Sequence, residues 1–235
     1  MPGSTVILLA AGSGRRMEGS VPDKALAPLG GLTAIGLSLR AFLAAGLNGP
    51  IIIVYRDDPQ KIALETAVEP VAPDPEKILW VPGGSERQAS VWNALRAAPI
   101  DSDYVYIHDV ARPCIHQGAI AALQLAVERD GAAVLAHPVV DTIKRIPHAG
   151  RLRSTQLEDL DRSRLWAMET PQAFEIERIR AAYRHVLDQG LEITDDTAAA
   201  ASIGLKTTLV PNPHPNPKLT TKDDLRSIEC LLKDV

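Results

Sequence analysis

Short apolar runs alternate with helical patterns along most of this chain, and this alternation constrains the fold more than any other feature. Val6–Leu9 reads as the first strand, and Thr33–Ala45 has the spacing of an amphipathic helix. Ile51–Tyr55 is then a continuous apolar run, as expected for a strand that is covered on both faces. The resulting βαβα order predicts an α/β fold with a mainly parallel sheet.

The rest of the chain extends this pattern into a Rossmann-like, twisted sheet with helices on both faces. With 235 residues, 46% of them apolar, the chain is long enough for one large core, so we assign residues 1–235 to a single domain. Further strands are expected at Lys77–Val81, Tyr104–His108, Ala132–Ala136, Ala167–Thr170 and Thr207–Val210, and helices at Glu86–Ala97, Ile115–Arg129, Ile176–Leu187, Asp195–Ile203 and Lys222–Lys233.

The pattern changes after Pro138, where a β-arm excursion is expected over about residues 138–164. Val139–Ile146 looks extended, residues 147–150 give a turn signal, and Leu152–Leu157 can return. Such a hairpin has few core residues and is poorly stable alone. The simplest surface to stabilise it is a second copy of the chain, so the sequence predicts a protruding arm for dimerisation.

The first strand leads into a loop of small residues followed by cations, which is typical of a phosphate site. Small residues let the backbone approach a bulky anion, and the cations attract it. A dinucleotide fingerprint is excluded because Met17 replaces its third glycine, and a Walker A loop is excluded because the loop does not end in Gly-Lys-Ser/Thr. A solvated basic helix start is the alternative, although the positive helix terminus disfavours paired arginines. The residues of this site are Ala10, Ala11, Gly12, Gly14, Arg15, Arg16 and Lys24.

Composition limits the partners of this loop. The net charge of −4 argues against a nucleic-acid surface, so the anion must meet a local cluster of cations. Cys114 and Cys230 form neither a disulfide framework nor a metal-ligand spacing, which fits a reducing cytoplasm. No apolar run reaches the roughly 20 residues of a membrane span, and no signal or transit segment is expected before the first strand.

Asp109 ends a predicted strand, at the edge where parallel sheets bind their ligands. A carboxylate beside a phosphate site requires a cation between them. We therefore predict Mg²⁺, or another divalent cation, held mainly by phosphate oxygens and water, with Asp109 as a direct or water-mediated ligand. Arg112 is a candidate for a second phosphate. An Asp109–Arg112 ion pair that closes the strand explains these residues equally well.

Two further segments carry candidate site residues. Gly83–Ser90 is a glycine turn before a helix; by itself it favours an ordinary capped helix, with Ser85 and Gln88 or Glu86 as cap residues. Residues 211–217 alternate prolines with other residues and form a stiff, extended track. This stiff segment is expected to hold Lys218 at a defined position before the last helix.

Together these segments resemble the 2-C-methyl-D-erythritol 4-phosphate cytidylyltransferases, a family of the non-mevalonate isoprenoid pathway. The resemblance covers nearly the whole chain and rests on seven motifs in order. These motifs are Leu9–Met17 with Lys24, Gly83–Arg87, His108–Pro113, Asp141–Lys144, Leu165–Trp166 with Thr170–Gln172, Thr194–Asp196, and Lys218 with Thr220. In two places the chain departs from the family pattern: Asp23 separates Pro22 from Lys24, and Ser85 stands where an aspartate is common.

The resemblance implies a homodimeric enzyme that transfers CMP from CTP to 2-C-methyl-D-erythritol 4-phosphate and releases pyrophosphate. Arg16, Lys24 and Lys218 would be the catalytic cations. Nucleotide binding would fall to Ala10, Ala11, Gly12, Gly14, Gly84, Ser85, Ser90 and Asp109. Substrate binding would fall to Arg112 and Thr170, with Thr142 and Arg162 supplied by the arm of the partner. A ribitol-5-phosphate cytidylyltransferase shares these features, and a non-catalytic nucleotide-binding regulator is the alternative from another class.

Overall fold

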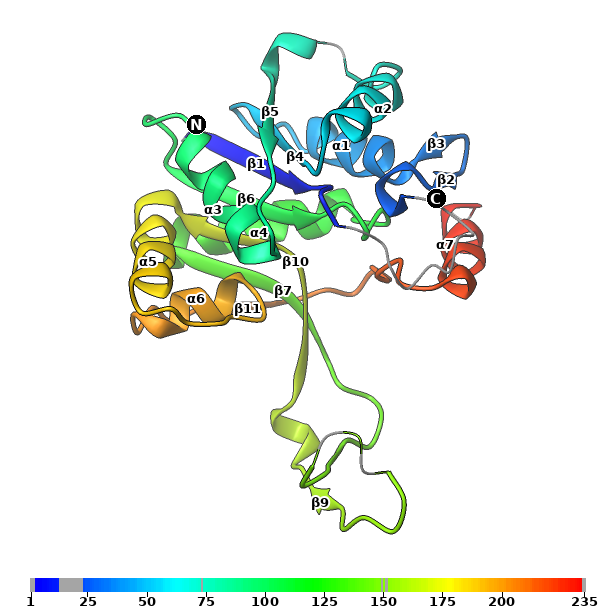
Figure 1. Ribbon diagram of the computed structural model, residues 1–235, viewed down its shortest axis with the longest axis vertical. Coiled ribbons are helices and arrows are strands. Elements are labelled where there is room, and N and C mark those ends of the chain that lie inside the picture. Colours follow the sequence, from blue (N-terminus) through cyan, green and yellow to red (C-terminus); the bar gives the residue numbers. More distant parts are fainter. Residues whose placement is uncertain (1–2, 13–22, 73, 149, 151, 234–235) are drawn as a thin grey trace.

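The structure is a computed structural model that describes residues 3–12, 23–72, 74–148, 150 and 152–233 (Figure 1). Its first elements are β1 (Ser4–Leu9), η2 (Lys24–Leu26), β2 (Pro28–Leu29), β3 (Leu32–Thr33), α1 (Ala34–Ala44), β4 (Ile51–Tyr55), α2 (Asp58–Val68), η3 (Pro75–Lys77), β5 (Ile78–Pro82) and α3 (Arg87–Ala97). There follow β6 (Tyr104–Asp109), α4 (Gln117–Asp130), β7 (Ala132–Pro138), β8 (Lys144–Arg145), β9 (Glu158–Asp159), η4 (Arg162–Arg164), β10 (Trp166–Glu175), α5 (Ile176–Asp188), α6 (Asp196–Ser202), β11 (Thr208–Pro211) and α7 (Lys222–Lys233).

Within the described residues, seven strands form one sheet in the order β11-β7-β10-β6-β1-β4-β5. The pairs β1–β4, β1–β6, β4–β5 and β7–β11 are parallel, which confirms the predicted mainly parallel α/β sheet. β10 is the exception, because it runs antiparallel to both β6 and β7. It is also longer than expected, since the strand continues through a register shift between Met168 and Gln172.

Helices cover both faces of the sheet, as the strand patterns predict. Along β4, Ile51 and Ile53 belong to one buried cluster, while Ile52 and Val54 belong to the other. This alternation follows from the two-residue period of a strand. The first cluster includes residues of α1, α2, α4 and α7, and the second includes residues of α3, α5 and α6. A strand buried on both faces must be apolar at every position, which explains the uninterrupted run in β4.

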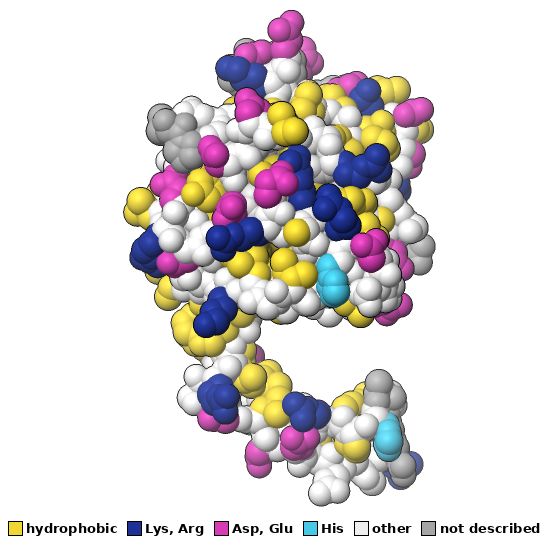
Figure 2. Space-filling view, turned by 90° about the vertical axis from the view of Figure 1, so that its left-hand side faces the viewer, with side chains coloured by type: hydrophobic (Ala, Val, Ile, Leu, Met, Phe, Trp, Pro, Cys, Tyr) yellow, Lys and Arg dark blue, Asp and Glu magenta, His cyan; other side chains and the backbone are white. Residues whose placement is uncertain are grey.

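Between β7 and β10 the chain leaves the body as an arm, which is the narrow extension in Figures 1 and 2. β8 and β9 pair antiparallel within it, and Lys144 contacts Asp159 while Arg145 contacts Glu158 across the ladder. The returning strand therefore lies at Glu158–Asp159, and its expected position at Leu152–Leu157 was wrong. Apolar side chains of the arm are exposed, most of all Val140 at 76% and Leu152 at 79%.

The helix α2 was not among the expected elements, although its start carries a recognisable signal. Asp57 is the N-cap, its side chain accepts a hydrogen bond from the backbone N–H of Gln60, and Pro59 lies in the first turn. This combination is typical of a helix start. No helix in the described part of the chain is long and apolar enough to cross a membrane.

Candidate active site

A cavity of about 750 Å³ opens at the carboxyl ends of β1, β4 and β6, where ligands bind in sheets of this kind. Residues 9–12, 24–25, 56, 84–87, 90, 109–111 and 218–220 line it. The structure therefore brings together Ala10, Ala11, Gly12, Lys24, Gly84, Ser85, Ser90, Asp109 and Lys218 from segments that are distant in sequence. Gly14 and Arg16 lie outside the described residues.

Lys24 is the first residue of η2 and lines the cavity. Its Nζ donates a hydrogen bond to the backbone oxygen of Thr220 at 2.9 Å, so the segment after Lys218 lies beside it. The residue before Lys24, Asp23, has a structural role. Asp23 caps η2 by accepting from the N–H of Ala25, and its other oxygen accepts from Gln60 and Arg56.

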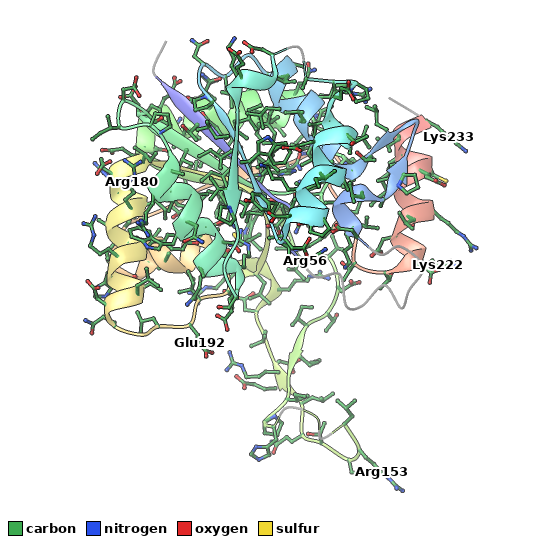
Figure 3. All side chains as sticks on the ribbon, turned by 45° about the horizontal axis from the view of Figure 1, so that its top comes forward. Arg56, Arg153, Arg180, Glu192, Lys222 and Lys233 are labelled. Carbon is green, nitrogen blue, oxygen red and sulfur yellow. The ribbon has the colours of Figure 1, made fainter. Side chains whose placement is uncertain are left out.

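Arg56 is a cation of this cavity that the sequence analysis missed. It follows β4 and lines the cavity, on the side of the body from which the arm extends (Figure 3). Asp23 and Asp57 hold its guanidinium through Nη1 and Nε, at 3.2 and 2.9 Å. A signal existed, because a charged residue directly after a buried strand in a parallel sheet falls at the ligand-binding edge.

Asp109 connects two cations that come from distant parts of the chain, Arg87 and Lys218. Its Oδ2 accepts from Lys218 Nζ at 2.6 Å, and its Oδ1 lies 3.3 Å from Arg87 Nε. Burial opposes the charged carboxylate, but Arg87 and Lys218 outweigh burial and hold the pKa of Asp109 well below its ordinary value. The group is therefore ionised at neutral pH and places the Lys218 ammonium at the cavity.

Arg87 is held in turn by a buried carboxylate. Its Nη1 and Nη2 donate to the two oxygens of Asp196 at 2.9 and 2.8 Å, and Asp196 is fully buried at the start of α6. The hydroxyl of Tyr183 also donates to Asp196. Asp195 is the N-cap of α6 and Asp196 lies in its first turn, so both aspartates stand at the helix start. Asp196 additionally holds Arg87.

The glycines before α3 are required by close packing. A Cβ at Gly84 would lie 2.3 Å from the Cβ of Ala89, and one at Gly83 would lie 2.8 Å from the Cβ of Ala11. The Gly84 N–H donates to Ser90 Oγ at 3.0 Å, so the turn is folded onto its own helix. The N-cap of α3 is Glu86, one of the expected cap residues, but its side chain makes no cap hydrogen bond. Ser85 is an exposed residue that lines the cavity.

Behind the cavity, His108 and Thr170 hold the end of β6. The backbone N–H of Asp109 donates to Thr170 Oγ1 at 3.0 Å, and the same oxygen lies 3.2 Å from His108 Nδ1. Burial lowers the pKa of His108 to about 4, so its ring is neutral at neutral pH. Thr170 is buried and positions Asp109 through the backbone rather than lining the cavity.

Arg112 does not pair with Asp109, so the alternative of a strand-closing Asp109–Arg112 ion pair was wrong. Among the described residues, the ion pairs of Asp109 are with Arg87 and Lys218. Arg112 Nη1 instead donates to the backbone oxygen of Asn216 at 2.7 Å. This contact ties Arg112 to the segment that leads to Lys218.

Thr142 and Arg162 lie on the arm and do not line the cavity of their own chain. Both are exposed, and Arg162 Nη1 donates to the backbone oxygen of Val140 at 2.6 Å. Their predicted place in an active site therefore depends on the arm of another copy.

The donor set of the cavity suits a metal ion that depends on its substrate. In the described part of the chain, no group of three or more His, Cys, Asp or Glu side chains could hold a metal. Asp109 and Glu86 line the cavity, and the oxygens of Asp109 face Lys218 and Arg87. Mg²⁺ is commonly bound by one or two carboxylates together with substrate phosphates and water, and this site fits that mode.

Comparison with known proteins now bears on this cavity. Residues 4–234 match the family model of IspD, 2-C-methyl-D-erythritol 4-phosphate cytidylyltransferase. The chain belongs to this family of cytidylyltransferases. It is therefore an enzyme that transfers a cytidylyl group from CTP to 2-C-methyl-D-erythritol 4-phosphate in isoprenoid biosynthesis.

Relatives of the same name agree over nearly the full length of the chain. The cytidylyltransferase of Synechococcus elongatus is 38% identical over 234 residues, covering 97% of this chain and 95% of the relative, and that of Prochlorococcus marinus (strain MIT 9515) is 32% identical over 229 residues, covering 97% and 99%. The 4-diphosphocytidyl-2C-methyl-D-erythritol synthase structure from Anaerococcus prevotii has a TM-score of 0.83 at 26% identity, covering 99% of this chain and 96% of that one. For the Thermus thermophilus enzyme the TM-score is 0.76 at 28% identity, with coverages of 99% and 100%.

Proposed function

We propose that the cytidylyltransferase reaction takes place in the 750 Å³ cavity, with Lys24 and Lys218 as catalytic cations. The observation that carries this proposal is their convergence. Lys24 contacts the backbone of Thr220, and Lys218 lies on Asp109, so both reach one cavity beside the glycine loop. Arg16 is proposed as a third catalytic cation from the same loop.

The reaction needs placement and charge neutralisation rather than a base. A phosphate monoester has a second pKa of about 6, so the sugar phosphate is largely dianionic at neutral pH and already a nucleophile. One of its oxygens attacks the α-phosphorus of CTP, a new P–O bond forms, and the bond to the leaving pyrophosphate breaks. Lys24 and Lys218 stabilise the negative charge that builds up on the α-phosphate.

The remaining site residues have proposed places in the same cavity. The backbone of Ala10, Ala11, Gly12 and Gly14 approaches the triphosphate, and Gly84, Ser85 and Ser90 face the cytosine. Arg87 supports the site indirectly, because Asp196 and Asp109 already balance its charge. Arg112 and Thr170 shape the sugar-phosphate side through the Asn216 carbonyl and the Asp109 backbone.

The family depends on a divalent metal ion, and we propose Mg²⁺ for this chain. Asp109, directly or through water, would hold it together with phosphate oxygens. When bound, the ion neutralises phosphate charge and orients the leaving group. Lys218 and Arg87 contact the same carboxylate, so these cations and the metal ion would share one anionic group.

The arm is proposed to complete the site of a second copy in a homodimer. Its side chains of Val140 and Leu152 are exposed, and a small hairpin of this kind is poorly stable alone. A partner surface would cover these apolar groups and place Thr142 and Arg162 at the sugar phosphate. The cytoplasm is the proposed compartment, in keeping with two cysteines that are both free.

The decisive experiment is pyrophosphate release from CTP with a panel of polyol phosphates. Turnover with 2-C-methyl-D-erythritol 4-phosphate far above that with ribitol 5-phosphate is expected. Preferential turnover of ribitol 5-phosphate would show that the chain is a ribitol-5-phosphate cytidylyltransferase. If CTP binds but no member of the panel leads to pyrophosphate release, the chain is a nucleotide-binding protein without this catalytic activity.

A further inference from the structure

Glu169 is a buried acid on β10 whose carboxylate contacts the segment that carries Lys218. Its side chain is only 4% exposed. Oε2 accepts hydrogen bonds from the side-chain amides of Asn212 and Asn216, both at 2.8 Å. Oε1 faces His137 Nδ1 at 2.6 Å. One carboxylate therefore binds two asparagines that stand on either side of a proline-rich stretch.

This stretch has little conformational freedom between its two anchors. Pro213 and Pro215 lie between the anchors and restrict the backbone to a narrow range of φ, and Pro217 does the same directly after Asn216. At its start, the Asn212 N–H donates to the Ala136 oxygen at 2.9 Å. At its end, Asn216 Nδ2 also donates to the Thr170 oxygen at 3.0 Å. Holding both ends of a stiff segment fixes the path of everything between them.

Lys218 lies between the Asn216 anchor and one further backbone contact. The Leu219 N–H donates to the Ala111 oxygen at 2.6 Å, directly beyond the lysine. The Cα of Lys218 is thus held from both sides, and its Nζ meets Asp109 at 2.6 Å. The side chain of Glu169 does not line the cavity, and its contacts with Asn212 and Asn216 connect it to the segment that carries Lys218.

We propose that Glu169 is a positioning residue that sets the place of the Lys218 ammonium in the cavity. The inference rests on the proposed catalytic role of Lys218. Burying a carboxylate is costly, and apolar residues of similar volume often stabilise a fold equally well. A network of hydrogen bonds gives geometric precision that an apolar contact lacks, and a displacement of 1 Å at a reacting group can cost about 10²-fold in rate.

Two substitutions of Glu169 distinguish the effect of its hydrogen bonds from the effect of its charge. Glu169→Leu removes both acceptors and leaves the amides of Asn212 and Asn216 without this partner. Glu169→Gln keeps one side-chain oxygen for the two asparagines and places its amide nitrogen on the side of His137 Nδ1. We therefore expect Glu169→Leu to lower kcat by about 10- to 100-fold, and Glu169→Gln to restore kcat to within about threefold of the parent.

The test measures pyrophosphate release with CTP and 2-C-methyl-D-erythritol 4-phosphate for five proteins: the parent, both Glu169 variants, Lys218→Ala, and the Glu169→Leu/Lys218→Ala double variant. The KM for CTP should change by less than about threefold in Glu169→Leu, because the glycine loop and the turn before α3 are untouched. The double variant should be no slower than Lys218→Ala, since Glu169 acts through Lys218. Glu175→Gln, at the far end of the same strand and paired with Arg178 at 2.7 Å, is the matched control.

The outcomes distinguish this inference from the proposed function. A slow Lys218→Ala with a parent-like Glu169→Leu would overturn the positioning role alone. Losses that multiply in the double variant would do the same, because they show that Glu169 acts independently of Lys218. A parent-like Lys218→Ala would overturn the catalytic role of Lys218 and the positioning inference with it.

A second measurement keeps the inference testable if Glu169→Leu folds poorly. Asn212→Ala removes one of the two anchors from a partly exposed position and should lower kcat in the same direction, by about threefold to tenfold. Amide hydrogen exchange should rise in the peptide over residues 212–219 and stay unchanged in β4. If Asn212→Ala has the kcat and the amide exchange of the parent, the contact between Glu169 and Asn212 does not position the segment that carries Lys218.

Discussion

Asp109 and Lys218 stand 109 residues apart in the chain, and their side chains meet at 2.6 Å on the floor of the cavity. The carboxylate belongs to the end of β6, and the lysine belongs to a loop after β11 at the far edge of the sheet. The tertiary structure thus brings a strand end and a stiff loop together and places the Lys218 ammonium in the cavity.

Replacing either cavity lysine should slow the chemical step. Lys24→Ala and Lys218→Ala are each expected to lower kcat by about 10²–10³-fold, by analogy with the loss of an oxyanion donor. The dissociation constant of CTP should change much less. Steady-state pyrophosphate release and calorimetric CTP binding measure the two effects, with Lys61→Ala on α2 as a control outside the cavity. Near-normal turnover in both variants would exclude this role.

Arg56→Ala should weaken nucleotide binding rather than turnover. The guanidinium lines the cavity and is held in place by Asp23 and Asp57, so it offers a pre-positioned donor to an anionic ligand. We expect the KM for CTP to rise by about threefold to tenfold, with kcat near the parent value. An unchanged KM for CTP would show that Arg56 faces no part of the nucleotide.

The neighbouring aspartates 195 and 196 should differ in their effect on stability. Asp196→Ala leaves Arg87 without its buried partner and should cost about 3–5 kcal/mol. Asp195→Ala mainly removes an N-cap and should cost about 1 kcal/mol. Urea unfolding followed by circular dichroism compares the two. Equal losses would contradict the supporting role of Asp196.

Acid should destabilise the fold through His108. Burial lowers the pKa of His108 to about 4, while the unfolded ring has a pKa of about 6.5. Between these values the unfolded chain binds a proton that the folded chain does not, so stability falls as the pH drops from 6.5 toward 4, by roughly 3 kcal/mol in all. Unfolding free energies of the parent and His108→Gln between pH 7 and 5 test this. The same slope in both proteins would rule out His108 as its source.

Arm exchange gives a direct test of the dimeric site. Arg162→Ala is expected to raise the KM for the sugar phosphate and leave that for CTP unchanged, with Arg145→Ala on the same arm as control. If Arg162 and Lys218 of one site come from different copies, mixing Arg162→Ala with Lys218→Ala should recover activity above either variant alone. No recovery after verified subunit exchange would place both residues on one chain.

The sequence predicted the sheet well because a strand buried on both faces leaves a clear apolar run, as in β4. The resemblance implied that Lys24, Asp109 and Lys218 share one site, and all three line the cavity. Interactions that depend on distant side chains left weaker signals. Asp196 lies in the first turn of α6, and only the structure shows Arg87 against it. The contacts of Glu169 were hidden in the same way, because its partners lie in another segment.

The single reversed strand, β10, has a geometric consequence for the whole enzyme. Adjacent strands of opposite direction can be joined at one end, whereas parallel neighbours require a crossover. The chain therefore leaves the sheet at the end of β7 and returns to it at the start of β10, both at the edge where the cavity opens. Had β10 run parallel to β7, the chain would have had to cross to the opposite edge of the sheet before pairing. The direction of β10 therefore lets both ends of the arm join the sheet at the edge that holds the cavity.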